Sequence, residues 1–229
     1  MTTLILKIVL TLVLAYLIGT FNPTYLLGKL FKKKDIHDYG SGNPGSTNSI
    51  RVFGPKFGFL CMALDIAKGA LAVVLCRLLV VPGLAPGSDM AIFWELVTGI
   101  ACILGHMYPL YMHFKGGKGI AASLGILLVI NWKLFLIAGI PALLVLGSLR
   151  IMSVASLTFE FLIFLCYLCA YRMSPDFYYI LAASAVYPIF GFYGHRSNLR
   201  RLALGTEPRL WGKGSKKDPT KQQESPKSS

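Results

Sequence analysis

Charged residues are scarce in this chain, and acidic residues are the scarcest. Only 14 % of its 229 residues are charged, and just 10 residues are Asp or Glu, whereas soluble domains carry about 25 % charged residues. Hydrophobic residues make up 55 % of the chain, and the mean hydropathy is +0.60. Because too little polar surface is left to cover a soluble core, we predict an integral membrane protein.

Residue groupings typical of metal centres, redox pairs and hydrolase triads are also lacking. The four His never approach a His-x-x-x-His spacing, and the acidic residues are scattered singly, which argues against a catalytic metal. Cys166 and Cys169 are spaced like a redox pair, but they lie inside a long apolar run with no second pair nearby. We interpret them as packing residues. We expect neither a metal nor another cofactor.

Apolar runs long enough to cross a membrane recur along the chain. The segment from Ile120 to Leu149 would form a helix of about 45 Å, well beyond a hydrocarbon core of about 30 Å. Asn131-Trp132-Lys133 interrupts it, so we predict two short helices there, at 120–130 and 134–149. The predicted fold class is an all-α, polytopic membrane bundle of seven helices, with the other five at 4–27, 57–81, 91–112, 152–171 and 177–193.

Basic residues outnumber acidic ones by 23 to 10, which gives a formal net charge of +13. Lys and Arg concentrate in cytoplasmic loops, and seven spans place 18 of the 23 on one side. We therefore expect an outside N-terminus, a cytoplasmic C-terminus and no nucleic acid partner. We expect one membrane domain over 1–211 and a disordered basic tail over 212–229, where Lys, Ser and Pro replace apolar residues.

Three polar segments fall on that basic side. The first is Gly-Ser-Gly-Asn-Pro-Gly-Ser-Thr-Asn at 40–48, followed by Arg51. Its glycines allow a close backbone approach, and its N–H groups, hydroxyls and guanidinium suit a phosphate. The spacing is similar to a nucleotide P-loop, but Ser46 stands where that loop needs lysine, and a plain connecting turn is the alternative. The candidate residues are Ser41, Gly42, Asn43, Gly45, Ser46, Thr47, Asn48 and Arg51.

The second segment joins the end of one span to the start of the next. It runs from Gly105-His106 to Lys-Gly-Gly-Lys-Gly at 115–119, and the glycines and lysines open a helix. Free N–H groups, the helix dipole and two cations together favour an anion. A basic turn that only sets membrane orientation is the alternative, and His106 could be a structural hydrogen bonder. The candidate residues are His106, Lys115, Gly116, Gly117, Lys118 and Gly119.

The third segment follows the last span. His195 and Asn198 lie three residues apart ahead of a Gly-Thr-Glu run that ends at Glu207, on what we predict to be an interfacial amphipathic helix. Binding to lipid headgroups is the alternative for its arginines. Asp65 and Lys68 are spaced to form an ion pair inside a span; direct substrate contact by Lys68 is a second possibility.

Two phosphate-type sites beside lipid indicate an enzyme that joins or moves phosphorylated groups. A transporter of an organic phosphate is the main alternative, but transporters place such groups near the membrane midplane and often contain inverted repeats. Here the polar segments crowd one interface, and no repeat occurs. A noncatalytic scaffold for anionic lipid would not need Ser, Asn and Gly at fixed spacing.

The three segments, together with Asp65-x-x-Lys68-Gly69, resemble the bacterial acyl-phosphate:glycerol-3-phosphate acyltransferases of the PlsY type over about residues 4–210. One departure is Thr20-Phe21-Asn22-Pro23, where that family usually has Ser-Ile-Pro. The resemblance implies transfer of a fatty acyl group from acyl phosphate to the 1-hydroxyl of glycerol 3-phosphate. The products are 1-acylglycerol 3-phosphate and inorganic phosphate, in the first acylation of phospholipid synthesis.

The resemblance also implies a site at the cytoplasmic face of a bacterial inner membrane, with membrane lipid around it and no obligatory protein partner. Because acyl phosphate is already activated, such a site must mainly position two substrates and stabilise charge. We expect Ser41, Arg51, His195 and Asn198 to act in catalysis. The remaining candidates, with Lys68 and Glu207, are expected to bind substrate phosphate, and the second segment to hold glycerol 3-phosphate.

Overall fold

The structure is a computed structural model that describes residues 2–85 and 88–210. The described residues form helices and no strand, so the predicted all-α class is confirmed. The predicted tail at 212–229 lies outside them. The helices are α1 Thr2–Thr20, α2 Pro23–Lys32, α3 Ser46–Phe53, α4 Pro55–Leu79, α5 Met90–Met107, α6 Ile120–Ile130, α7 Trp132–Leu149, α8 Met152–Ala170, α9 Phe177–Gly194 and α10 Arg196–Ala203. Short 3-10 helices cover Ile36–Asp38, Val81–Gly83 and Leu110–Met112.

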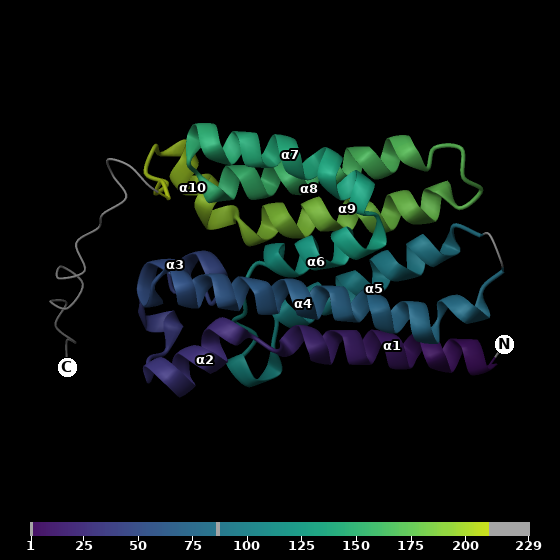
Figure 1. Cartoon of the computed structure of the whole chain (residues 1–229), viewed down its shortest axis with the longest axis horizontal. Helices are drawn as coiled ribbons and strands as arrows, with labels where there is room; N and C mark the ends of the chain where they lie inside the picture. The colour runs from purple at the N-terminus through teal and green to yellow at the C-terminus, as the bar shows by residue number, and fades with distance from the viewer. Residues whose placement is uncertain (1, 86–87, 211–229) are drawn as a thin grey trace, which may run out of the picture.

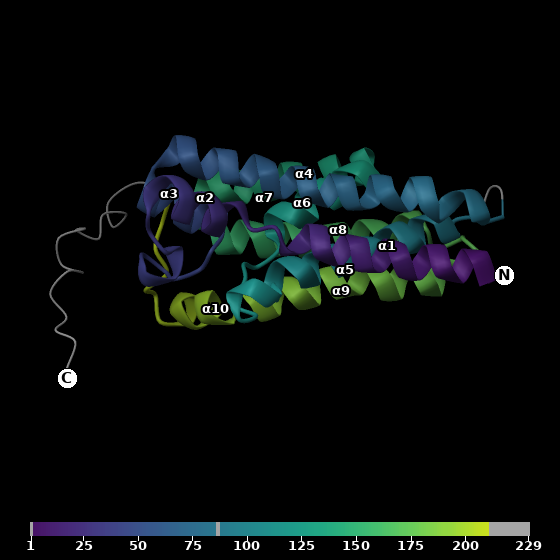
Figure 2. The ribbon, with the colours of Figure 1, turned by 90° about the horizontal axis from the view of Figure 1, so that it is seen from below.

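The long helices lie side by side along one axis (Figures 1 and 2). One group contains α1, α4, α5 and α6, and the other contains α7, α8 and α9. A core of buried residues, among them Leu96, Ile126 and Tyr187, joins the groups, and α5 packs on α9. The short helices α2, α3 and α10 gather at the end opposite the start of α1.

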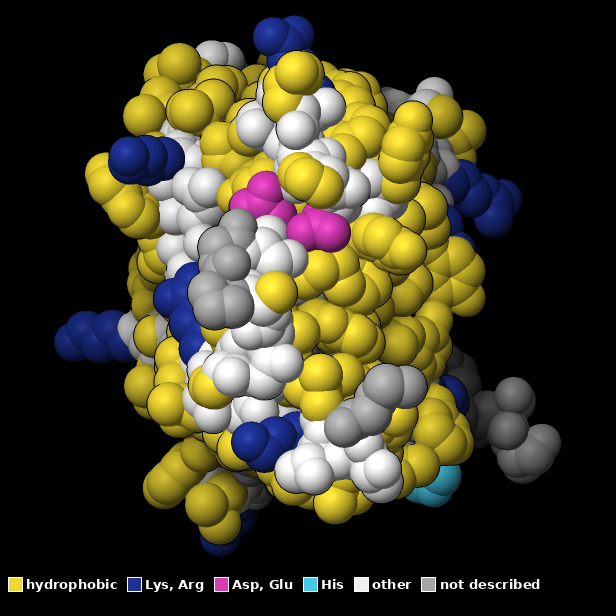
Figure 3. All heavy atoms as spheres, turned by 90° about the vertical axis from the view of Figure 1, so that its right-hand side faces the viewer, with side chains coloured by type: hydrophobic (Ala, Val, Ile, Leu, Met, Phe, Trp, Pro, Cys, Tyr) yellow, Lys and Arg dark blue, Asp and Glu magenta, His cyan; other side chains and the backbone are white. Residues whose placement is uncertain are grey.

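Apolar side chains cover much of the molecule, as the end view in Figure 3 shows. Leu143 and Leu144 on α7 are 67 % and 68 % exposed, an exposure that would promote aggregation in water but suits lipid. Within the described residues, six helical segments are long and apolar enough to cross a membrane, and α6, with 11 residues, is shorter. The chain is therefore built as an integral membrane helix bundle.

The predicted interruption at Asn131 is present. Helix α6 ends at Ile130, and the Asn131 side chain accepts a hydrogen bond of 3.2 Å from the N–H of Leu134. Arg77 donates to the Val129 carbonyl at 2.8 Å and pairs with Glu95 at 2.8 Å. Helix α6 is shorter than a full membrane crossing, and these contacts supply hydrogen-bond partners for the polar groups at the turn that follows it.

The first helix differs from the prediction of a single span to about residue 27. Helix α1 ends at Thr20, and Pro23 begins α2 as its first residue, because proline lacks the N–H that would continue the first helix. Asn22 accepts from the N–H of Tyr25 at 2.9 Å and so caps α2. The amine of Lys68 donates to the carbonyls of Gly19 and Phe21, at 3.1 and 2.6 Å.

Candidate functional site

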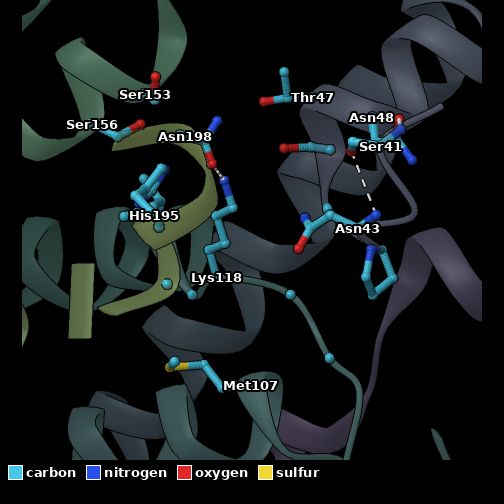
Figure 4. A pocket seen from close by; sticks show the side chains of 18 of the residues that line it. Ser41, Asn43, Thr47, Asn48, Met107, Lys118, Ser153, Ser156, His195 and Asn198 are labelled. Carbon is cyan, nitrogen blue, oxygen red and sulfur yellow. Dashed lines mark hydrogen bonds between the residues drawn. The ribbon is translucent and has the colours of Figure 1, made fainter. Parts of the chain in front are cut away.

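A cavity of about 540 Å³ opens at the end of the bundle that carries α2, α3 and α10. Its walls come from the loop before α3, the loop between α5 and α6, the start of α8, and α10 (Figure 4). The three polar segments, which lie up to about 150 residues apart in the chain, therefore meet in one place. The predicted site residues that line the cavity are Ser41, Gly42, Asn43, Gly45, Ser46, Thr47, Asn48, Arg51, His106, Lys115, Gly116, Gly117, Lys118, Gly119, His195, Asn198 and Glu207.

The loop at 40–48 is shaped by the side chain of Asn48. Its carbonyl oxygen accepts from the N–H of Ser41 at 3.0 Å, and its amide donates to the Tyr39 carbonyl at 3.0 Å. Gly40 and Gly42 adopt φ values of +63° and +70°, which L side chains rarely adopt. Asn48 thus holds the loop, while Arg51 makes no ion pair with the described residues and remains available to an anion.

The loop before α6 folds back on the end of α5. The N–H groups of Gly116 and Gly117 donate to the carbonyls of Met107 and His106, at 2.9 and 3.1 Å. A Cβ atom on Gly117 would lie 2.1 Å from Nε2 of His106, so only glycine fits there. The loop is therefore packed directly against the His106 ring.

The Asp65–Lys68 ion pair predicted from the spacing is present, at 2.8 Å, and both side chains are buried. The Lys68 amine also lies 2.7 Å from Nδ1 of His106. Lys68 also donates to the backbone carbonyls of Gly19 and Phe21, at the end of α1 and just after it. The structure therefore does not bring Lys68 to the cavity wall, as the prediction of substrate contact would require. Lys68 instead contacts His106, which does line the cavity.

Lys118 lies at the centre of the cavity and points to Asn198 (Figure 4). It donates a hydrogen bond to the Asn198 side chain, whose own amide donates to Glu207 at 2.5 Å. Burial lowers the pKa of Lys118 to about 8, helped by the charges of Arg201 and Arg51 and opposed by that of Glu207.

Glu207 collects three hydrogen bonds. Besides Asn198, it accepts from Ser153 Oγ at 2.8 Å and from Arg201 Nε at 2.7 Å. Burial alone would raise its pKa, but the hydrogen bonds from Asn198, Ser153 and Arg201 outweigh burial, and the pKa lies below its usual range. Glu207 is therefore an anion that orients Asn198 and α10, with its oxygens already occupied.

His195 is 4 % exposed and lies beside Lys118 in the cavity wall. Its Nδ1 is 2.8 Å from the Gly191 carbonyl, and since a carbonyl only accepts, Nδ1 carries the proton. Burial, together with the Lys118 charge, lowers the pKa of His195 to about 4. The ring is neutral at pH 7, so Nε2 is a hydrogen-bond acceptor.

Further cavity residues escaped the sequence analysis. Ser153 and Ser156 begin α8 and line the cavity (Figure 4), but their segment looks like an ordinary span. His37 also lines the cavity, and its Nε2 lies 2.9 Å from the Lys115 carbonyl. Arg201 on the third polar segment lines the cavity as well; the sequence left its role open between this site and lipid headgroups, and we did not include it among the candidate residues. The nearby acidic residue Glu207, with which Arg201 pairs, was the one sequence feature that could have indicated a role for Arg201 in the site.

Comparisons with known proteins identify the family of this chain. The family model described as glycerol-3-phosphate acyltransferase matches residues 9–205. The glycerol-3-phosphate acyltransferase of Lactiplantibacillus plantarum is 41 % identical over 201 residues, which cover 88 % of this chain and 91 % of the relative. That of Staphylococcus aureus strain N315 is 40 % identical over 204 residues, covering 89 % and 98 %.

Two solved structures have a similar fold. The glycerol 3-phosphate form of PlsY, an integral membrane glycerol 3-phosphate acyltransferase, matches with a TM-score of 0.77 at 31 % identity, over 90 % of this chain and 96 % of that one. Its lysophosphatidic acid form matches with a TM-score of 0.74 at 31 % identity, over 88 % and 94 %. By its sequence and its fold, this chain belongs to the glycerol-3-phosphate acyltransferase family.

Proposed function

We propose that this chain transfers a fatty acyl group from acyl phosphate to the 1-hydroxyl of glycerol 3-phosphate. The hydroxyl oxygen attacks the acyl carbonyl carbon, the bond from that carbon to the phosphate oxygen breaks, and the hydroxyl proton passes to the departing phosphate. The products are 1-acylglycerol 3-phosphate and inorganic phosphate. The observation that carries the proposal is that the three polar segments, whose residues suit a phosphate, meet in one cavity of a membrane bundle.

The cavity offers separate ligands for two phosphates. Ser41 and the backbone of 43–48 lie on one side, and His195 and Asn198 lie on the other (Figure 4). Arg51 lines the same cavity. Lys118 stands between the two sides, and Lys115 and the glycines of 116–119 complete the wall. We assign glycerol 3-phosphate to the 115–119 side. Cations and donors fixed in advance stabilise charge that develops on the carbonyl and the leaving phosphate.

His195 is suited to orient the attacking hydroxyl. With Nδ1 held by Gly191, its Nε2 can accept a hydrogen bond. A pKa of about 4 makes it a weak base, so the proton goes to an oxygen of the acyl phosphate itself. Its role is therefore positioning of the nucleophile.

We further propose seven crossings within a single membrane domain over 1–211. Ile120 at the start of α6 and Met152 just after the end of α7 both line the cavity, so α6 runs away from the cavity end of the bundle and α7 returns to it. With α6 counted as a crossing, the N-terminus is outside and the cavity faces the cytoplasm of a bacterial inner membrane, in keeping with the charge bias.

The test is the reaction itself. Purified full-length protein is incubated with acyl phosphate, with and without glycerol 3-phosphate, while free phosphate and 1-acylglycerol 3-phosphate are measured. We expect equal amounts of both products, and only when glycerol 3-phosphate is present. No product in either case rejects the proposal, and movement of intact glycerol 3-phosphate across a vesicle membrane would support a transporter.

The rate should fall as the pH rises through the pKa of Lys118. With a pKa of about 8 in the free enzyme, the amine loses its charge above that pH and its attraction for phosphate weakens. We expect kcat/KM for glycerol 3-phosphate to decline above about pH 8 in profiles from about pH 6.5 to 9.5. A Lys118→Arg variant keeps its charge throughout and should lack the decline. The same decline in that variant would contradict the assignment.

Replacing Asn22 should slow catalysis, although Asn22 does not line the cavity. Its amide donates to the Pro44 carbonyl at 3.0 Å, and its side chain is fully buried. Asn22→Ser keeps a residue that caps α2 well but is too short to reach Pro44. We expect kcat to fall about tenfold with a smaller change in KM, because small displacements of reacting groups are costly.

The control for Asn22→Ser is Tyr187→Phe, which removes a 2.9 Å bond from a buried hydroxyl to the Leu96 carbonyl, between two core residues that do not line the cavity. Both variants should lose stability on the order of 1 kcal/mol. Only Asn22→Ser should change kcat. Equal kcat values in the two variants would show that the Asn22–Pro44 bond does not position the loop.

A further inference from the structure

A second hollow lies on the outside of the bundle, at the same end as the cavity. It is a groove of about 620 Å³ between the end of α2 and the junction of α3 and α4. It shares no lining residue with the catalytic cavity, so it is a separate site. Its lining consists of Lys32, Phe53, Gly54, Pro55, Lys56, Phe57 and Leu60.

The floor of the groove is apolar and open. The rings of Phe53 and Phe57 meet edge to face with centroids 5.1 Å apart, and Leu60 is 51 % exposed. Gly54 has a φ of +93°, and a Cβ atom there would have no neighbour within 4 Å. Apolar surface of this kind at the edge of a membrane span is suited to an acyl chain.

The rim of the groove is positive. The amine of Lys32 lies 5.6 Å from the centroid of the Phe57 ring, and Lys56 lines the same groove. Both side chains are exposed, and neither forms an ion pair with an acid among the described residues. Lysines that lie with their stems on apolar surface and their amines toward water match the phosphate level of a bilayer.

We propose that this groove binds a membrane phospholipid with an anionic headgroup. The headgroup phosphate lies between Lys32 and Lys56, and an acyl chain follows Phe57 and Leu60 along α4. Charge complementarity selects the headgroup: two amines that have no acidic partner among the described residues attract a net negative lipid, whereas the ammonium of a zwitterionic lipid opposes them. Each basic residue near an anionic membrane surface contributes roughly fivefold in affinity, so the two together should contribute more than tenfold.

The groove and the cavity share helix α3. Phe53 is the last residue of α3, and Thr47, Asn48 and Arg51 on the same helix line the cavity. A lipid seated on Phe53 therefore packs on the helix that carries one phosphate loop. Because a ligand that binds only the folded state stabilises it, lipid in the groove should raise the thermal unfolding temperature.

The test counts bound lipids on the full-length protein. The protein in detergent is titrated with phosphatidylglycerol or with phosphatidylcholine of the same chains, and retained lipids are counted by native mass spectrometry. We expect wild type to retain phosphatidylglycerol at about one tenth of the phosphatidylcholine concentration, and only phosphatidylglycerol to raise the unfolding temperature. The double variant Lys32→Gln/Lys56→Gln should lose both preferences, and since both positions are exposed its helix content should match wild type by circular dichroism.

Lys133→Gln is the matched control. Lys133 also lies over an aromatic ring, 5.9 Å from the centroid of Trp132, but outside the groove. This variant should keep the full preference for phosphatidylglycerol. Equal retention of the two lipids by wild type, or an unchanged preference in the double variant, overturns the proposal. Because no step measures acyl transfer, this result is independent of the proposed reaction.

Discussion

Replacing Ser41 and Arg51 together with Ala is expected to lower kcat/KM for acyl transfer by at least about 100-fold. Removal of one donor that stabilises transition-state charge typically costs 100-fold or more, and here two go at once. Ser41 is exposed at the cavity, and Arg51 makes no ion pair with the described part of the chain. Their loss removes ligand contacts. Among the described residues it leaves only the N–H of Asn43, which donates to Ser41 Oγ at 3.4 Å, without its acceptor.

The measurement is initial-rate phosphate release over a range of both substrates. The control is Ser148→Ala/Arg172→Ala, an exposed serine and arginine that do not line the cavity, and it should retain wild-type kcat and KM. Asn48 still holds the loop in the test variant, so its unfolding temperature should stay close to that of wild type. A loss of only a few fold would remove Ser41 and Arg51 from the site.

Replacing Lys118 with Met should have a comparably large effect. Methionine has a similar length but no charge, so the variant loses the cation at the centre of the cavity and leaves the Asn198 carbonyl oxygen without its donor. We expect kcat/KM to fall about 100-fold or more. Because Lys118 stands between the two sides of the cavity, both kcat and the KM for glycerol 3-phosphate should change.

Lys115→Met provides the comparison on the same loop. Lys115 is exposed, and solvent screening weakens the attraction of an exposed cation for phosphate. Its loss should cost roughly tenfold or less, mainly in KM. If Lys115→Met is as damaging as Lys118→Met, then the burial of Lys118 does not set its importance.

Local sequence patterns were sufficient for much of the architecture. Apolar run lengths predicted the helices, and Asn131 marked the turn between α6 and α7, where it caps the next helix. The phosphate-type segments could be recognised because glycines, hydroxyls and cations within a dozen residues define a loop's chemistry wherever it lies. The break after Thr20 was missed, since hydrophobicity continues through it and only Asn22 and Pro23 end the helix.

The sequence by itself determined the membrane class, the helical content and the identity of the polar loops, because each depends on residues that are neighbours in the chain. Only the tertiary structure decided which groups meet. Lys118 and Asn198 are 80 residues apart, and Ser153 and Glu207 are 54 apart. It also turned Lys68 inward, to carbonyls 47 and 49 residues away. Such contacts depend on how the helices pack, and packing is a property of the whole bundle that no local pattern encodes.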